Sequence, residues 1–134
     1  MKTTRRIVLK AIGASSLNPV IALSTTGIKN KMAQRIIPST GDLLPVIGLG
    51  TSRVFDTDLS DKSLSPRKEI IKALLDHGGN LIDTSPMYGK AEKVTGKIAQ
   101  DLKVNDQLFL ATKVWIEGRE AGEIQMKESS KKIK

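Results

Sequence analysis

Three side chains of the sequence, a carboxylate, a phenol and an amine, have the types and the spacing that proton transfer requires. Asp83 follows the apolar pair Leu81-Ile82, Tyr88 comes five residues later, and Lys113 follows the apolar stretch 108–112. A free phenol has a pKa of about 10 and is a poor acid at neutral pH. A nearby ammonium group favours the phenolate, and a carboxylate keeps that ammonium group charged and in place. Together, the three groups could let a tyrosine donate a proton to a developing alkoxide.

Each of these residues also has a purely structural interpretation. An aspartate after a strand often caps a helix, a lone tyrosine often packs with its hydroxyl at the surface, and a lysine at a strand end is usually solvated. The residues alone therefore leave both interpretations open.

The elements that would position these side chains alternate between strands and helices. Turn formers at 39–42 predict a β-hairpin within residues 35–46, and the apolar stretch 46–50, closed by glycines, predicts a buried strand. Residues 81–83 and 108–112 predict two further strands. Strands of this kind, separated by amphipathic helices, are typical of a parallel sheet covered by helices.

The predicted helices follow from capping residues and apolar spacing. Ser65 and Pro66 predict the start of a helix, with Ser65 as the N-cap, and Gly78-Gly79 predicts its end. A second helix is predicted from about Ala91, and a third from near Glu123. The inward-facing positions of the first two are Ile70, Ile71, Leu74, Leu75, Val94, Ile98 and Leu102. This order places all three chemical groups at the C-terminal ends of the strands, where such folds carry their active sites.

Three ordered motifs resemble those of the aldo/keto reductase family. Residues 46–51, Val-Ile-Gly-Leu-Gly-Thr, resemble its first-strand motif, and residues 81–89, Leu-Ile-Asp-Thr-Ser-Pro-Met-Tyr-Gly, resemble its second, with Ala91-Glu92 and Gly96 after it. Residues 111–114, Ala-Thr-Lys-Val, resemble the third. The resemblance covers residues 35–134 and implies an α/β fold, the N-terminal portion of a (β/α)8 TIM barrel. That portion would hold the hairpin and about three βα units.

The resemblance implies reduction of a small carbonyl compound by NADPH, with NADH as the alternative cofactor. A hydride would pass to the carbonyl carbon, Tyr88 would supply the proton, and Asp83 and Lys113 would tune Tyr88. The cofactor-binding residues that it implies are Gly50, Thr51, Asp83 and Lys113. Tyr88 and Trp115 would line the substrate pocket.

The sequence departs from the family in its histidine and in its length. The family's catalytic histidine closes the fourth strand, whereas His77, the sole histidine, lies at the end of the first predicted helix and is interpreted as a helix C-terminal residue. A complete barrel takes about 250 residues, and the fourth strand has not begun by Lys134. We therefore expect an incomplete barrel that is unstable or aggregates and does not oxidise NADPH by itself. A non-catalytic binding or regulatory protein and the product of a decayed gene are the alternatives, and the DNA after codon 134 would separate them.

Residues 1–34 follow a different pattern from the remainder. They hold six basic side chains and no acidic one, so the net charge of +8 leaves only +2 for residues 35–134. The sequence Thr-Arg-Arg-Ile-Val-Leu-Lys at 4–10, with a moderately apolar stretch after it, resembles a twin-arginine signal peptide. We expect residues 1–34 to direct export to the periplasm through the twin-arginine machinery. A general secretory signal or an ordinary basic N-terminus would be the other interpretations.

Composition excludes several functional classes. The hydrophobic fraction of 39% permits a core, and the absence of cysteine excludes disulfides, a thiolate nucleophile and cysteine-ligated zinc. No metal site is predicted. No apolar run reaches the ~18–20 residues of a membrane-spanning helix. The nearly balanced charge of residues 35–134 argues against a nucleic-acid partner.

Overall fold

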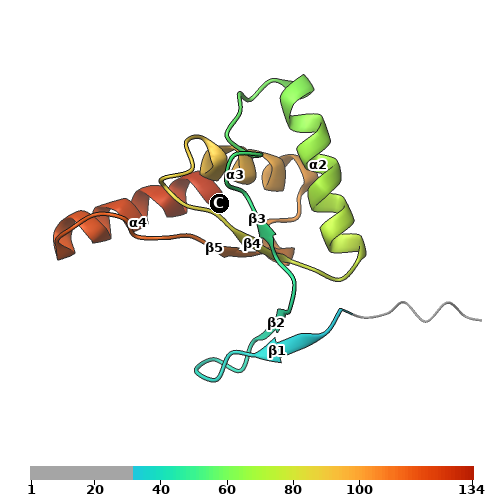
Figure 1. The fold of residues 1–134 in the computed structure, drawn as a ribbon, viewed down its shortest axis with the longest axis horizontal. Helices are drawn as coiled ribbons and strands as arrows, with labels where there is room; N and C mark the ends of the chain where they lie inside the picture. The colour runs from blue at the N-terminus through green and yellow to red at the C-terminus, as the bar shows by residue number, and fades with distance from the viewer. Residues whose placement is uncertain (1–31) are drawn as a thin grey trace, which may run out of the picture.

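The computed structural model describes residues 32–134, which form a small antiparallel hairpin and a parallel sheet with helices against it (Figure 1). The predicted export signal, residues 1–34, lies almost entirely outside the described residues. In chain order the elements are β1 (Gln34–Ile36), β2 (Leu43–Pro45), β3 (Leu49–Gly50), α2 (Asp61–Asp76), β4 (Leu81–Asp83), α3 (Ala91–Leu102), the 3-10 turn η1 (Asn105–Gln107), β5 (Phe109–Ala111) and α4 (Arg119–Ile133).

The parallel sheet has the order β3-β4-β5, so the strand that ends in Asp83 lies in the middle. Asp83 is in register with Gly50 on one side and with Ala111 on the other. Successive side chains of a strand point to opposite faces, and Ile82 is fully buried in the core. Asp83 therefore points to the opposite face of the sheet from that core. The predicted α/β arrangement with a parallel sheet is confirmed.

The hairpin is confirmed, whereas the strand predicted after it is shorter than expected. β1 and β2 pair antiparallel, and Ile37 N–H donates to Asp42 O across the turn at 2.8 Å. Only Leu49 and Gly50 of the predicted strand 46–50 find partners on β4. The N–H of Val46 instead donates to Ala33 O at 2.9 Å. The side chains of Val46 and Ile47 are consequently exposed, which corrects the prediction that this stretch is buried.

The first long helix, α2, begins earlier than predicted. Its N-cap is Ser60, whose hydroxyl accepts a hydrogen bond from Ser63 N at 3.3 Å, and not Ser65. Asp58 strengthens this start, since its carboxylate accepts from Ser60 N at 2.8 Å and from Ser63 Oγ at 2.9 Å. These hydrogen bonds hold the pKa of Asp58 down at about 2. Pro66 thus lies inside the helix, where its ring nitrogen lacks the proton for one helical hydrogen bond.

The helix α3 begins at Ala91 as predicted, whereas α4 begins at Arg119 and not near Glu123. The core lies between β4 and the helices α2 and α3, and its buried members are Phe55, Leu64, Ile71, Ile82, Ala91, Val94 and Ile98. The stripe predicted on α2 is therefore correct for Ile71, while Ile70 remains 37% exposed. Among residues 32–134, no helix has the length and apolar character to cross a membrane.

Candidate active site

Asp83 and Lys113 meet at the C-terminal ends of the two neighbouring strands β4 and β5. The Lys113 ammonium group donates to both carboxylate oxygens of Asp83, at 2.8 Å to Oδ1 and 2.7 Å to Oδ2. It also donates to the main-chain oxygen of Thr84 at 3.0 Å. Three acceptors around one ammonium group fix its position, because they use all three of its N–H bonds.

Strand alternation explains why Lys113 faces Asp83. Leu110 packs against the core on the helix side of the sheet, so Ala111 and Lys113 point to the other face and Thr112 points back toward the helices. The hydrogen bond from Thr84 N to Ala111 O, at 2.8 Å, continues the ladder as far as this point. The extended backbone after β5 therefore places the Lys113 side chain next to the Asp83 carboxylate of the central strand.

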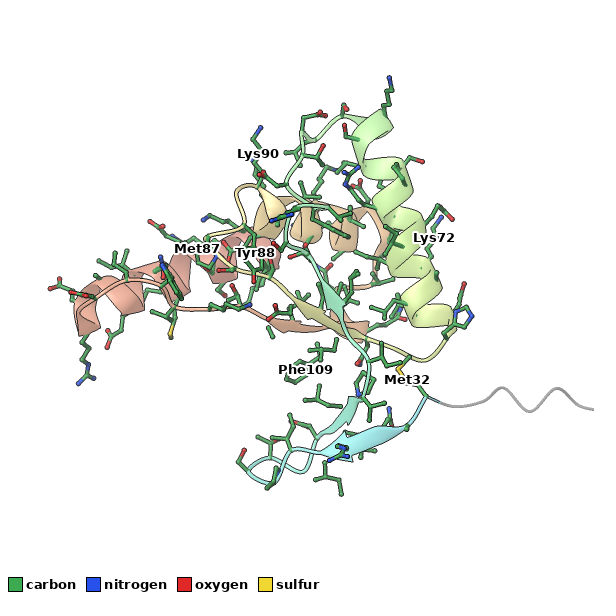
Figure 2. All side chains as sticks on the ribbon, in the orientation of Figure 1. Met32, Lys72, Met87, Tyr88, Lys90 and Phe109 are labelled. Carbon is green, nitrogen blue, oxygen red and sulfur yellow. The ribbon has the colours of Figure 1, made fainter. Side chains whose placement is uncertain are left out.

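Tyr88 joins this pair from the loop between β4 and α3 (Figure 2). Its ring centroid lies 5.0 Å from the Lys113 ammonium nitrogen. The loop is a tight turn, in which Tyr88 N donates to Ser85 O and Ala91 N donates to Tyr88 O, both at 3.0 Å. The structure thus brings together all three residues that the sequence singles out for proton transfer.

A glycine next to the tyrosine makes the tight turn possible. Gly89 has a φ of +56°, and any Cβ at this position would collide with the Asp56 carboxylate. That carboxylate accepts a hydrogen bond from Lys90 N at 3.0 Å, at the residue just before α3. Asp56 therefore connects the β3–α2 loop to the loop that carries Tyr88, a role that the sequence analysis missed.

The electrostatics of the site favour a charged lysine. Its hydrogen bond to Asp83 raises the pKa of Lys113 above the ordinary 10.5, against the opposing effect of partial burial, and nearby Tyr88 raises it further. The Lys113 side chain is 38% exposed. A positive charge therefore stays beside the tyrosine ring throughout the neutral range.

The residues predicted near the cofactor and substrate lie at the same end of the sheet. Gly50 ends β3 beside Asp83, and a Cβ there would meet no atom within 4 Å. Thr51 is fully buried, and its hydroxyl donates to the main-chain oxygen of Asp83 at 3.0 Å. Trp115 is 64% exposed on the loop after β5, where its main-chain N–H donates to Gln125 Oε1 at 2.6 Å.

His77 lies away from this end of the sheet. It is the C-cap residue of α2, which leads into the start of β4, and its Nδ1 lies 2.8 Å from Ala73 O. This position agrees with its interpretation as a helix C-terminal residue. Within residues 32–134, the structure has no group of three histidine, cysteine or acidic side chains that could hold a metal ion.

Sequence reasoning also missed the connection between Glu92 and Thr112. Both belong to the motifs that resemble the family, yet their contact joins the first turn of α3 to the segment after β5, at 2.8 Å between Thr112 Oγ1 and Glu92 Oε1. A signal was present, since Glu92 is an acid on the helix face that also carries Ala91 and Val94.

Comparisons with known proteins show the family to which the chain is similar. The sequence pattern of the Aldo/keto reductase family matches residues 46–134. Aldo-keto reductase YhdN of Bacillus subtilis is 39% identical over 79 residues, which are 58% of this chain and 24% of that protein. Methylglyoxal reductase DkgB of Salmonella typhi is 31% identical over 93 residues, 68% of this chain and 32% of that protein.

A solved structure shows the same fold. The crystal structure of an aldo/keto reductase from Klebsiella pneumoniae, in complex with NADP and acetate, superposes with a TM-score of 0.56 and 28% identity. The match covers 69% of this chain and 32% of that one. The described elements are thus a partial α/β counterpart of an aldo/keto reductase TIM barrel. The chain spans about a quarter of the length of the Bacillus subtilis relative and about a third of that of the Salmonella typhi relative. Since the family pattern covers most of its length, this chain belongs to the aldo/keto reductase family.

Proposed function

We propose that this chain contributes the proton-donating part of an NADPH-dependent carbonyl reductase, with NADH as the alternative cofactor. The observation that carries the proposal is the Lys113 ammonium group, held by both oxygens of Asp83 and lying 5.0 Å from the Tyr88 ring centroid. The substrates would be aldehydes and ketones, which become alcohols. The similarity to reductases, one of them solved with NADP, supports this choice.

The proton would come from Tyr88. As a carbonyl is reduced, negative charge develops on its oxygen, and a hydroxyl group within reach can donate a proton to it. The proton leaves negative charge on the phenol oxygen, which the nearby Lys113 ammonium group stabilises. Asp83 holds that ammonium group in place and keeps it charged, as the raised pKa of Lys113 indicates.

The cofactor would bind at the same end of the sheet. A bound reduced nicotinamide would supply the hydride for the carbonyl carbon. Gly50 offers a side-chain-free position beside Asp83, and a Cβ there would meet nothing within 4 Å, so a flat ring can approach the backbone. Thr51, Asp83 and Lys113 would complete this edge of the cofactor site. Tyr88 and the exposed ring of Trp115 would line the substrate pocket.

A segment exchange tests the proposal. Residues 46–134 replace the aligned segment of the Bacillus subtilis relative, and the chimaera is assayed for oxidation of NADPH with methylglyoxal as the aldehyde. We expect activity that falls by about 100-fold or more in the Tyr88→Phe variant, the range for losing a general acid. A folded chimaera that binds NADPH yet reduces no carbonyl, or that is indifferent to Tyr88→Phe, would contradict the proposal. The 134-residue chain alone is expected not to oxidise NADPH, given the share of its relatives that it spans.

We also propose that residues 1–34 direct twin-arginine export. The support is the adjacent pair Arg5-Arg6, with Leu9-Lys10 after it and no acid before Asp42. Fusion of residues 1–34 to a fluorescent protein that must fold before export should place fluorescence in the periplasm. The double change Arg5→Lys and Arg6→Lys should abolish it, and export that survives this change would exclude the twin-arginine route.

A further inference from the structure

Glu92 is a buried acid that the proton-transfer scheme does not use. It is 2% exposed, in the first turn of α3. Withdrawing a carboxylate from water costs several kcal/mol unless partners replace the water. Two partners do so here: Thr112 Oγ1 donates to Oε1 at 2.8 Å, and the Lys132 ammonium group lies 3.4 Å from Oε2.

The partner Thr112 lies directly before Lys113, on backbone that belongs to no strand or helix. The last ladder bond near it is the one from Thr84 N to Ala111 O. Because side chains alternate along extended backbone, Thr112 and Lys113 point to opposite sides. Thr112 is hydrogen-bonded to Glu92 of α3 on the helix side of the sheet, and Lys113 is hydrogen-bonded to Asp83 on the opposite side. The Thr112–Glu92 bond thus fixes, from the rear, the backbone that carries the lysine.

The same turn of α3 is connected to the tyrosine. Ala91, the residue before Glu92, donates its N–H to Tyr88 O at 3.0 Å. Glu92 therefore lies between the segment that carries Tyr88 and the segment that carries Lys113, and it is bonded to the second through Thr112.

We propose that Glu92 is a positioning residue, which holds Lys113 against Asp83 and beside Tyr88 through its hydrogen bond to Thr112. The proposal rests on the proposed function only in that Lys113 assists proton donation by Tyr88. The geometric claim can be tested in the 134-residue chain without any turnover. If the carbonyl reductase assay fails, the positioning role of Glu92 is not contradicted. If the labelling test fails, the proposed carbonyl reductase function is not contradicted.

The test measures how fast the Lys113 amine is acylated at a series of pH values, in dilute solution, with peptide mass spectrometry as the readout. Only the uncharged amine reacts, so release from Asp83 lowers the pKa of Lys113 and speeds its labelling at a fixed pH. The exposed Lys72 is an internal reference in the same sample. The labelling rate of Lys113 in the Asp83→Asn variant shows how large the effect is when the amine is completely released from the carboxylate.

Two variants remove the hydrogen bond, and two keep it. Thr112→Val and Glu92→Leu should speed Lys113 labelling by about twofold or more, in the direction of Asp83→Asn. Thr112→Ser and Glu92→Gln retain a donor and an acceptor, and should restore labelling close to that of the unaltered chain. Near-ultraviolet circular dichroism reports folding, because Tyr88 and Trp115 are the sole tyrosine and tryptophan. Should Glu92→Leu unfold the chain, Thr112→Val decides, since it leaves Glu92 and Lys132 paired.

Thr95→Val is the matched control. Thr95 is a fully buried threonine of the same helix, and its hydroxyl has no hydrogen-bond partner among the described residues. Its replacement should leave Lys113 labelling unchanged. The proposal is overturned if Thr112→Val, folded, labels at the unaltered rate, or if Thr95→Val speeds labelling as much as Thr112→Val.

Discussion

At the scale of single residues, the pair of Lys113 and Asp83 combines structural and chemical roles. The lysine has three acceptors within hydrogen-bonding distance, two of which belong to Asp83. Because its side chain is 38% exposed, solvent screens the attraction and the pair adds little to stability. Its main consequence is therefore positional, namely a fixed positive charge beside Tyr88.

This pair predicts a specific dependence of stability on pH. The pKa of Lys113 is higher in the folded chain than its ordinary 10.5, so the pair stabilises the fold below that pH and the contribution is lost as pH rises through the folded value. We expect Lys113→Met to lower the free energy of unfolding by less than about 1 kcal/mol near neutral pH. In strongly alkaline solution the proteins with and without Lys113 should have the same free energy of unfolding.

Urea unfolding at neutral and alkaline pH measures this difference. Both proteins carry Tyr88→Phe, so that ionisation of the phenol does not contribute. A difference that stays constant across the alkaline range would show that the amine stabilises the fold by packing and not by charge.

At the scale of elements, the start of α2 shows where sequence reasoning succeeds and where it fails. The apolar stripe and the terminal glycines predicted the body and the end of the helix correctly, because burial and backbone conformation constrain those positions strongly. The proline after Ser65 predicted that serine as the N-cap, and this prediction was wrong. Ser60 forms the actual cap, since Asp58 and Ser63 complete a local hydrogen-bond network around it. A single cap residue is a weaker signal than such a network.

A pair of substitutions tests this helix start. Ser60→Ala should lower the free energy of unfolding by about 1 kcal/mol, the usual cost of a lost N-cap. Ser65→Ala lies inside the helix, where alanine is the better helix former, and should be neutral or stabilising by up to about 0.5 kcal/mol. Urea denaturation followed by far-ultraviolet circular dichroism measures both. A larger loss of stability in Ser65→Ala than in Ser60→Ala would instead support the helix start at Ser65 that was predicted from the sequence.

The contact between α3 and α4 predicts an unusual response to alanine at a helical glycine. Gly96 of α3 faces the end of α4, and a Cβ there would collide with Lys132 O and lie 3.0 Å from Ile133 Cα. These are backbone atoms, so α4 as a whole must move. Alanine normally stabilises a helix by about 1 kcal/mol relative to glycine, whereas overpacking costs about 1–3 kcal/mol. We therefore expect Gly96→Ala to be destabilising on balance.

Gly122 in α4 is the matched control for this prediction. A Cβ there would lie 3.3 Å from the Val114 side chain, which can rotate away. Gly122→Ala should therefore be neutral or stabilising in the same urea titration. Equal stabilisation by both substitutions would mean that α4 does not pack on Gly96.

At the scale of the whole molecule, the sequence was sufficient for the parallel arrangement of the strands and for the end of the sheet at which Asp83, Tyr88 and Lys113 lie. Both follow from the alternation of strands and helices and from the rule that parallel strands end at one edge. It was insufficient for contacts between elements that are distant in the chain, such as Asp56 with Lys90 and Glu92 with Thr112. Nothing in local periodicity encodes a contact across 20 or 34 residues, because it depends on how helix and loop pack after the sheet has formed.

The parallel sheet has two open outer edges, since among the described residues β3 and β5 each pair on one side only. Phe109 N–H and Ala111 O face β4, so the N–H and C=O of Leu110 between them point outward. Beside this edge Val114, Trp115 and Ile116 are 46%, 64% and 53% exposed. An open edge next to exposed apolar side chains is a template for association with another chain.

We therefore expect the 134-residue chain to self-associate as its concentration rises, measured by sedimentation velocity. The double change Trp115→Gln and Ile116→Gln removes apolar surface without altering the core, since both side chains are more than half exposed. It should move the onset of association to higher concentration. A matched pair on the hairpin, Ile36→Gln with Leu43→Gln, removes comparably exposed apolar side chains from a different sheet and should have the smaller effect. If association responds more strongly to the hairpin pair, the surface that mediates association lies on the hairpin. A chain that stays monomeric would show that the open edge is protected.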